Sequence, residues 1–284
     1  MNNAVDKTMK PLTIDLYLDG TLAAQRALTY LAPLARHPHV SVTLLVDQGN
    51  ETQAEALFEA AETRLQAANP PTRSVRGGTP ERAIVLEARA CQPDLMVFGP
   101  LRKEGWQRWL GQSAARSLAR RLTTSMLLMT GRPNELHRAL LCTAGGEEVL
   151  GDARMTAALL GPIHGQTTIL HIVSQMPLMF ERDQRSEEYL TEAVMGENSP
   201  ITRNIEAART ILSDSNVTTK VRVRVGLVVE QIQTELRAGG YDLLVIGAHN
   251  ARTPLDRVLL EDVSAELLRD SPLPVLLVQN YGGE

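Results

Sequence analysis

The chain has 284 residues, of which 43% are hydrophobic and 22% are charged, and this composition excludes disordered, collagen-like and coiled-coil proteins. Its 29 basic and 33 acidic side chains give a formal net charge of -4. We therefore expect no nucleic-acid partner, because no general positive field would hold a phosphate backbone. No apolar run approaches the roughly 18 residues of a membrane span, and residues 1–10 lack the apolar core of a secretion signal. We expect no membrane association and a cytoplasmic location.

The two cysteines and six histidines suggest no metal site. Cys91 and Cys142 are a weak disulfide framework for a chain of this length, so we expect both to be reduced thiols in the core. His37 and His39 flank a proline and form the one pair with metal-ligand spacing, but this pair by itself predicts no bound ion. His171 alternates with apolar residues and is expected to be buried in a strand.

The sequence contains an internal repeat. Residues 94–99 and 242–247 both read D-L-x-V-x-G, at an offset of 148, whereas 14–20 align with 139–145 at an offset of 125. The difference of 23 residues predicts an insertion in the second copy, near 175–200. A breaker-rich segment at 131–137 separates the copies. We predict two domains, 1–133 and 134–284.

Within each copy, short apolar runs alternate with longer amphipathic segments, as in βαβ units with a buried parallel sheet. The first copy has predicted strands at 12–18, 40–46, 72–75, 95–98 and 126–130, with helices at 23–35 and from Thr79 onward. The second has predicted strands at 139–143, 167–173, 220–225, 243–246 and 273–278, with a helix at 201–212. The predicted fold class is α/β, with two tandem five-stranded, doubly wound, Rossmann-like domains.

In such sheets ligands bind beyond the carboxyl ends of the strands, at the point where the strand order reverses. Asp19 and Gly20 follow the first strand, and a loop that opens at Gly99 follows the fourth. Gly111 begins the next helix, whose free N–H groups could hold an anion.

These features together resemble the universal stress protein family: a first strand ending in Asp-Gly, a Gly-x-Pro-x-x-x-Ile helix start at 78–84, D-L-x-V-x-G, a glycine loop, and Ser-Pro-Leu-Pro-Val at 271–275. The resemblance covers nearly the whole chain as two copies. It implies an intramolecular pseudo-dimer in which 126–130 runs antiparallel to 273–278, and it leaves a further homodimer open.

The resemblance also implies a nucleotide site in domain 1, for ATP or AMP. The nucleotide-binding branch carries G-x2-G-x9-G-[ST], with the first-strand Asp near adenine and ribose. Domain 1 keeps two of these glycines but has an arginine and a glutamine at the other motif positions, with a spacing of 12 instead of 13. The candidate cofactor-binding residues are Asp19, Gly20, Val46, Gly78, Gly99, Arg102, Gly111, Gln112 and Ser113.

Domain 2 departs further from this motif. It has Asn250 for the second glycine and an acidic pair, Glu261 and Asp262, where the phosphate pair should be, and its first strand ends without the Asp. Carboxylates would repel a triphosphate there. We expect domain 2 not to bind ATP in the family manner.

Several segments admit two interpretations. Arg102, Lys103, Arg108, Arg116, Arg120 and Arg121 form either a phosphate clamp or a solvated helix face. Trp106 and Trp109 either stack on a base, mark a partner contact, or pack on their own domain. The insertion either covers the domain 2 site, offers a docking surface, or packs on its own domain.

The motifs of serine and zinc hydrolases do not occur in the sequence, and no catalytic residues are assigned. The leading hypothesis is a non-catalytic stress-response protein that binds a protein partner or a small molecule. The alternative is an ATP- or AMP-binding regulator that uses domain 1 alone, with slow hydrolysis. A third, weaker hypothesis is an enzyme of the adenine-nucleotide α-hydrolase-like group, since 143–147 matches part of its phosphate loop.

Overall fold

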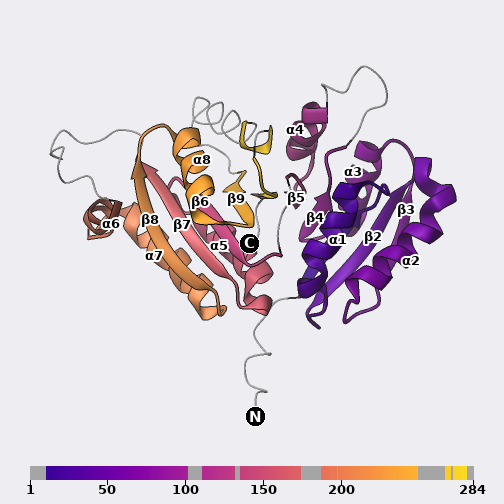
Figure 1. Ribbon diagram of the computed structural model, residues 1–284, viewed down its shortest axis with the longest axis horizontal. Coiled ribbons are helices and arrows are strands. Elements are labelled where there is room, and N and C mark those ends of the chain that lie inside the picture. Colours follow the sequence, from indigo (N-terminus) through magenta and orange to yellow (C-terminus); the bar gives the residue numbers. More distant parts are fainter. Residues whose placement is uncertain are drawn as a thin grey trace, which may run out of the picture. The chain divides into compact units, whose positions relative to one another are not determined.

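The computed structural model describes residues 11–101, 111–131, 135–173, 187–196, 198–248, 266–269 and 271–279. The chain divides into two compact units, Met1–Met129 (unit 1) and Thr130–Glu284 (unit 2), a few residues before the predicted boundary (Figure 1). Each unit is described by itself. The predicted pairing of 126–130 with 273–278 concerns the arrangement of the units and stays a prediction.

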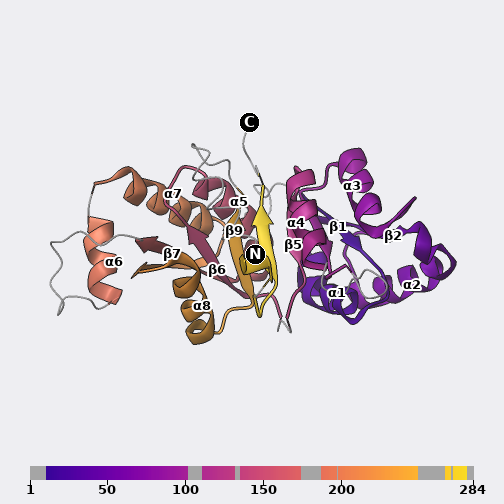
Figure 2. The ribbon, with the colours of Figure 1, turned by 90° about the horizontal axis from the view of Figure 1, so that it is seen from above.

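Unit 1 contains a sheet with the strand order β3-β2-β1-β4-β5, and all neighbouring strands are parallel. The order reverses between β1 and β4. Helices α1 and α2 cover one face of the sheet, and α3 and α4 cover the other (Figure 2). The elements are β1 (Leu12–Tyr17), α1 (Leu22–Ala35), β2 (Val40–Asp47), the 3-10 helix η1 (Gln48–Gln53), α2 (Ala54–Leu65), β3 (Thr72–Arg76), α3 (Pro80–Cys91), β4 (Leu95–Phe98), α4 (Gly111–Arg121) and β5 (Ser125–Leu128).

Unit 2 has the same strand order, written β8-β7-β6-β9-β10, and its neighbouring strands are again parallel. Helices α5 and α7 lie on one face and α8 on the other (Figure 2). The predicted fold class is therefore confirmed for both copies. The elements are β6 (Arg138–Thr143), α5 (Val149–Leu160), the 3-10 helix η3 (Gly161–Ile163), β7 (Gln166–Val173), α6 (Glu187–Gly196), α7 (Pro200–Asp214), β8 (Thr218–Val225), α8 (Val228–Gly239), β9 (Leu243–Gly247) and β10 (Val275–Val278).

Strands that helices cover on both faces form the core of each unit. Every residue of β4, β5 and β10 is buried, which explains why these strands read as continuous apolar runs. Strand β10 begins at Val275, two residues later than predicted, because the Ser271 side chain holds 271–273 in a turn, with Ser271 Oγ donating to the Leu273 carbonyl at 2.8 Å.

The aspartate of the repeated D-L-x-V-x-G motif has a structural role in both units. Asp94 Oδ2 accepts hydrogen bonds from the Thr13 backbone N–H and Thr13 Oγ1, both at 2.9 Å, and Asp242 Oδ2 accepts one from the Arg138 N–H at 3.0 Å. Each aspartate thus joins the start of the fourth strand to the start of the first. The motif marks the fold and not a ligand site.

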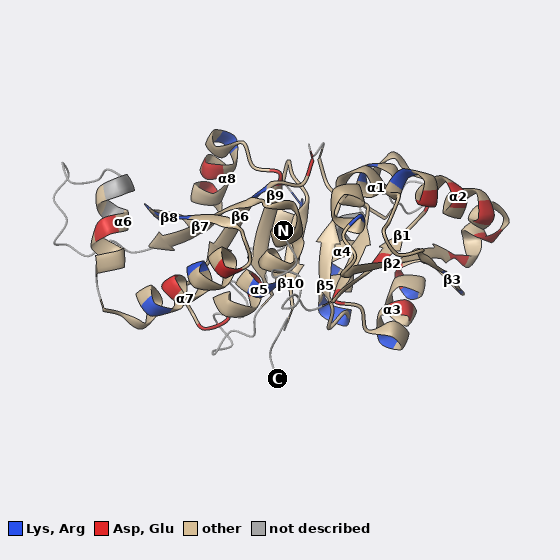
Figure 3. Ribbon diagram, turned by 90° about the horizontal axis from the view of Figure 1, so that it is seen from below, with Lys and Arg blue, Asp and Glu red and all other residues tan. Residues whose placement is uncertain are grey.

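A buried glutamate also recurs in both units. Glu87 on α3 is 1% exposed and pairs with Arg76, and Glu235 on α8 is 0% exposed and pairs with Arg222 and Arg224. These ion pairs attach each helix to the edge strand beneath it. Among the charged residues on the described helices, both signs occur along α3 and α7 and acidic side chains predominate along α2 (Figure 3).

The described part of the insertion packs on its own unit. Helix α6 lies beside the edge strand β8, where the Val223 N–H donates to Thr191 Oγ1 at 3.0 Å (Figure 1). A side chain thereby satisfies a backbone donor at this edge of the sheet. This favours the packing interpretation for 187–196, while 174–186 lie outside the described residues.

The cysteine prediction was wrong for one residue. Cys91 is exposed, because it closes the last turn of α3, and Cys142 is half-buried in β6; both are free thiols. None of the described helices combines the length and the apolar character needed to cross a membrane.

Candidate functional site

The candidate site of unit 1 lies at the carboxyl ends of its strands, around the reversal between β1 and β4. Five of the predicted residues come to this edge, on four different connections. This is the place where open α/β sheets bind ligands. The five residues are Asp19, Gly20, Val46, Gly78 and Gly99.

The loop after β1 is held by its own side chains. Asp19 Oδ1 accepts from the Thr21 N–H at 3.0 Å and from Thr21 Oγ1 at 2.6 Å, and Thr21 in turn caps α1 by accepting from the Ala24 N–H at 3.3 Å. Gly20 is exposed, with a left-handed φ of +72°, and a Cβ built on it would have Leu57 Cδ2 at 3.6 Å as its nearest described neighbour. The backbone of this loop is therefore exposed at Gly20, with Leu57 in ordinary van der Waals range.

A second carboxylate at this edge escaped the sequence analysis. Asp47 follows Val46 at the end of β2 and is 3% exposed. Its Oδ2 accepts from the Tyr17 hydroxyl and from Asn50 Nδ2, and its Oδ1 accepts from the Gly49 N–H at 2.7 Å. Burial and the bond to Asp47 raise the pKa of Tyr17 far above its usual range. The position of this acidic residue directly after a predicted apolar strand could have identified it in the sequence.

Two glycines at this edge meet backbone or packing requirements. Gly78 has a φ of +100° in the turn before α3. A Cβ on Gly99 would lie 2.7 Å from Ala23 Cβ, so this glycine lets α1 approach the end of β4. Packing alone thus accounts for Gly99, whereas the turn at Gly78 leaves its backbone beside the site.

Helix α4 begins at Gly111, as expected from the glycine loop, and places Gln112 and Ser113 in its first turn. The side chains of 111–113 are outside the described part of the chain, as are residues 102–110 with Arg102. In such folds the N-terminus of the helix that follows the fourth strand commonly supplies backbone N–H donors to an anion.

The basic residues predicted to form a phosphate clamp do not all lie at the first turn of α4. Arg120 and Arg121 occupy the last turn of α4, about 14 Å along the helix from its first residue. There they complement the helix dipole and lie too far away to clamp a phosphate at the first turn. This favours the solvated-face interpretation for these two residues. Lys103, Arg108 and the two tryptophans, Trp106 and Trp109, lie outside the described residues.

The same edge of unit 2 is packed differently. Gly145 has a φ of +84°, and a Cβ on it would lie 2.6 Å from Ile201 Cγ2 of α7. Asn204 Nδ2, also on α7, donates to the Gly145 carbonyl at 3.0 Å, and Thr143 Oγ1 accepts from the Gly145 N–H at 2.9 Å. Helix α7 therefore covers the loop that corresponds to the open Asp19–Gly20 loop of unit 1.

Other predicted features of unit 2 are partly described. His171 is 6% exposed and its Nδ1 lies 3.1 Å from the Thr143 carbonyl, which confirms a buried, hydrogen-bonded strand residue. Burial lowers its pKa. His249, Asn250, Glu261 and Asp262 lie outside the described residues.

The residues of unit 1 fit a small ligand in part. The exposed Gly20 loop, the Gly78 turn and the N-terminus of α4 suit an anionic group, because turn backbones and helix N-termini supply N–H donors. Asp19 Oδ1 and Asp47 are engaged within the protein, so they are structural groups here and not evident general bases.

Comparisons with known proteins agree with the duplicated fold. The family model described as "Universal stress protein family" matches residues 14–129 and 136–279. A universal stress protein from Archaeoglobus fulgidus DSM 4304 is 13% identical with a TM-score of 0.65, covering 97% of this chain and 98% of that chain. A functionally unknown protein from Pseudomonas aeruginosa PAO1 is 16% identical with a TM-score of 0.62, covering 94% and 92%.

The fold also occurs outside stress proteins. The cytoplasmic domain of a prokaryotic cation chloride cotransporter is 11% identical with a TM-score of 0.51, and the match covers 97% of this chain and 98% of that chain. No curated protein matches the chain. At these identities, structural likeness shows the fold alone.

Proposed function

Because the chain belongs to the universal stress protein family, we propose that it acts in the stress response by binding a small molecule or a protein partner, without catalysing a reaction. Unit 1 holds the ligand site, at the carboxyl ends of β1, β2 and β4. The observation that carries this proposal is the difference between the two units at the same sheet edge. In unit 1 Gly20 is exposed, whereas in unit 2 Gly145 is buried and Ile201 and Asn204 cover its loop.

The absence of catalysis is inferred from what the carboxylates at this edge do. Asp47 accepts three hydrogen bonds within unit 1, and Asp19 Oδ1 accepts two from Thr21. A general base needs a carboxylate that can accept the proton of a bound reactant. Groups held in this way support the loops around a ligand instead.

A second candidate function is an ATP- or AMP-binding regulator that uses unit 1 alone. Three features at one edge of the sheet favour it: the Gly20 loop, the Gly78 turn and the start of α4 at Gly111. Backbone N–H groups and a helix N-terminus suit phosphate. Gln112 takes the place of the small hydroxyl residue of the family motif and Arg102 that of a glycine. In this candidate function, the contacts to phosphate therefore differ from those of the family motif.

Isothermal titration with ATP and with AMP, in magnesium, tests both candidates. For the nucleotide candidate we expect one site per chain, and we expect Gly111→Glu to weaken it at least tenfold, because a carboxylate in the first turn of α4 repels the phosphates. Thr123→Glu is the matched control, since it adds the same charge at an exposed position beyond the other end of α4. The control should bind as the wild type does.

The outcomes separate the hypotheses. Two sites per chain would contradict the assignment to unit 1, and repeated turnover of ATP would contradict the non-catalytic proposal. No heat at concentrations that detect a Kd of about 100 μM, which corresponds to roughly 5.5 kcal/mol, would overturn the nucleotide candidate and leave partner binding as the function to pursue.

A further inference from the structure

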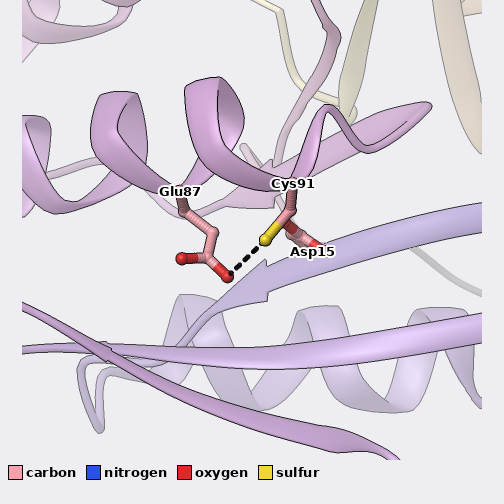
Figure 4. A group of neighbouring side chains, drawn as sticks. All are labelled: Asp15, Glu87 and Cys91. Atoms are coloured by element: carbon pink, nitrogen blue, oxygen red, sulfur yellow. Dashed lines mark hydrogen bonds between the residues drawn. The ribbon is translucent and has the colours of Figure 1, made fainter.

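Three potential metal ligands meet beneath α3 in unit 1. Asp15 is on β1, and Glu87 and Cys91 are one helical turn apart on α3, so they lie on the same face of that helix (Figure 4). One carboxylate oxygen of each acid and the Cys91 sulfur all lie within 4.8 Å of one another. This Asp15–Glu87–Cys91 cluster is separate from the strand-end site.

The two oxygens of Glu87 have different surroundings. Oε2 accepts from Ser74 Oγ at 3.0 Å and from Arg76 Nε, while the bond to Oε1 comes from the Cys91 thiol at 3.5 Å. The first pair of bonds fixes the orientation of the carboxylate, as the outer contacts of a metal ligand do. Oε1 becomes available to a cation once the thiol is deprotonated.

Asp15 is the unexplained member of the cluster. Its side chain is 2% exposed, and its Oδ2 has no hydrogen-bond partner among the described residues. An unsatisfied buried carboxylate oxygen is costly, and native proteins rarely leave one without a partner. One carboxylate oxygen of the same side chain lies within 4.8 Å of a Glu87 oxygen and of the Cys91 sulfur.

Unit 2 shows what the fold requires at this place. Glu235 corresponds to Glu87 and is satisfied by Arg222, Arg224 and Tyr241, at 2.7 to 2.9 Å. By the repeat offsets of 125 and 148, the positions of Asp15 and Cys91 are occupied by Leu140 and Gly239. The buried glutamate is thus part of the fold, whereas Asp15 and Cys91 are additions peculiar to unit 1.

We propose that Asp15, Glu87 and Cys91 bind a zinc ion. Carboxylates and a thiolate together suit Zn²⁺, whereas Mg²⁺ and Ca²⁺ take oxygen ligands. With Cys91 ionised, the cluster has three negative groups and one positive group, Arg76, so a divalent cation brings its charge to zero. Binding releases the thiol proton to solvent.

The geometry allows a tetrahedral site with one open position. Zinc–ligand bonds of about 2.0 to 2.3 Å place ligand atoms about 3.5 Å apart, so the cluster contracts slightly on binding. Cys91 is exposed, which provides the route of entry and room for a water molecule as the fourth ligand. The sequence analysis predicted no metal site, because Asp15 and Glu87 are far apart along the chain.

The test uses the full chain without a histidine tag, reduced and treated with a chelator, then titrated with Co²⁺ and Zn²⁺. We expect one ion per chain, a sulfur-to-cobalt charge-transfer absorption, and a higher Tm with Zn²⁺. Cys91→Ser should abolish the absorption, and both Cys91→Ser and Asp15→Asn should weaken Zn²⁺ binding at least tenfold. Cys142→Ser, which changes the other thiol, should leave both signals unchanged.

The proposal is overturned if the wild type gives no thiolate absorption, if Cys91→Ser keeps it, or if Asp15→Asn binds Zn²⁺ as the wild type does. Cys91→Ser changes an exposed position at a helix end, so it tests the site independently of Asp15→Asn. Gly111→Glu should bind Zn²⁺ normally, which separates this result from the nucleotide titration.

Discussion

Replacing Glu235 with alanine should lower the free energy of unfolding by about 3 to 5 kcal/mol, because it removes one side of a buried ion pair. Glu235 is 0% exposed and accepts from Arg222, Arg224 and the Tyr241 hydroxyl. The Arg224 side chain is only 12% exposed, so its charge would lose its main compensation. Urea unfolding of the full chain at neutral pH, followed by circular dichroism, measures the loss.

Glu230→Ala is the matched control, because Glu230 is an exposed residue on the same helix. Its loss should be small, within about 0.5 kcal/mol. Burial raises the pKa of Glu235, but the bonds from Tyr241 and Arg222 outweigh this and hold the pKa below its usual range. The stabilisation is therefore present at neutral pH and disappears in acid. Equal losses for the two variants would contradict the structural role of Glu235.

In metal-free buffer at pH 8, Asp15→Asn should raise the free energy of unfolding by roughly 2 to 3 kcal/mol. The pKa of Asp15 is raised from 3.8 to about 6, mainly because the carboxyl group is buried. The hydrogen bond with Thr43 lowers this pKa, the negative charge of Glu87 raises it, and the positive charge of Arg76 lowers it. The folded state therefore holds this proton more tightly than the unfolded chain does. Ionised Asp15 destabilises the fold above that pKa, and asparagine has no charge to bury.

The stabilisation by Asp15→Asn depends on pH. Since the folded pKa is the higher one, the cost of Asp15 is absent near pH 4, grows between pH 4 and 6, and is complete above that range. The advantage of Asp15→Asn should follow the same curve, measured by urea unfolding at several pH values. Glu59→Gln, at an exposed position on α2, should show no such curve. An advantage equal at pH 4 and pH 8 would contradict the account.

Most of the fold could be predicted from the sequence, because alternating apolar runs and amphipathic segments leave few arrangements for a parallel sheet. Strands β4 and β1 were predicted within one residue, since their burial produces clear apolar patterns. The repeat with unit 1 predicted the strands of unit 2. Strand β8 has a less regular apolar pattern than the central strands, because it lies at the edge of the sheet.

The side-chain clusters were harder to predict. Asp15 and Tyr17 on β1 are buried whereas Thr13 is exposed, and the sequence analysis singled out none of the three. Cys91 is exposed at the last position of α3, which the sequence analysis did not predict. Contacts between residues far apart in sequence follow from packing, and periodicity carries no information about them.

The two units differ at the strand-end loop and around the buried glutamate. Unit 1 has an exposed strand-end loop at Gly20 and has Asp15 and Cys91 beneath α3. Unit 2 covers its loop with Ile201 and Asn204 and satisfies its buried glutamate with two arginines and a tyrosine. We infer that unit 1 has the binding role and that unit 2 supports it structurally.

Hydrogen–deuterium exchange of the full chain, with and without saturating ATP, tests this division most directly. If unit 1 binds nucleotide, we expect slower exchange in peptides covering the Gly20 loop and the start of α4, with no change around Gly145. Protection of the Gly145 loop, or of neither loop, would contradict a nucleotide site confined to unit 1.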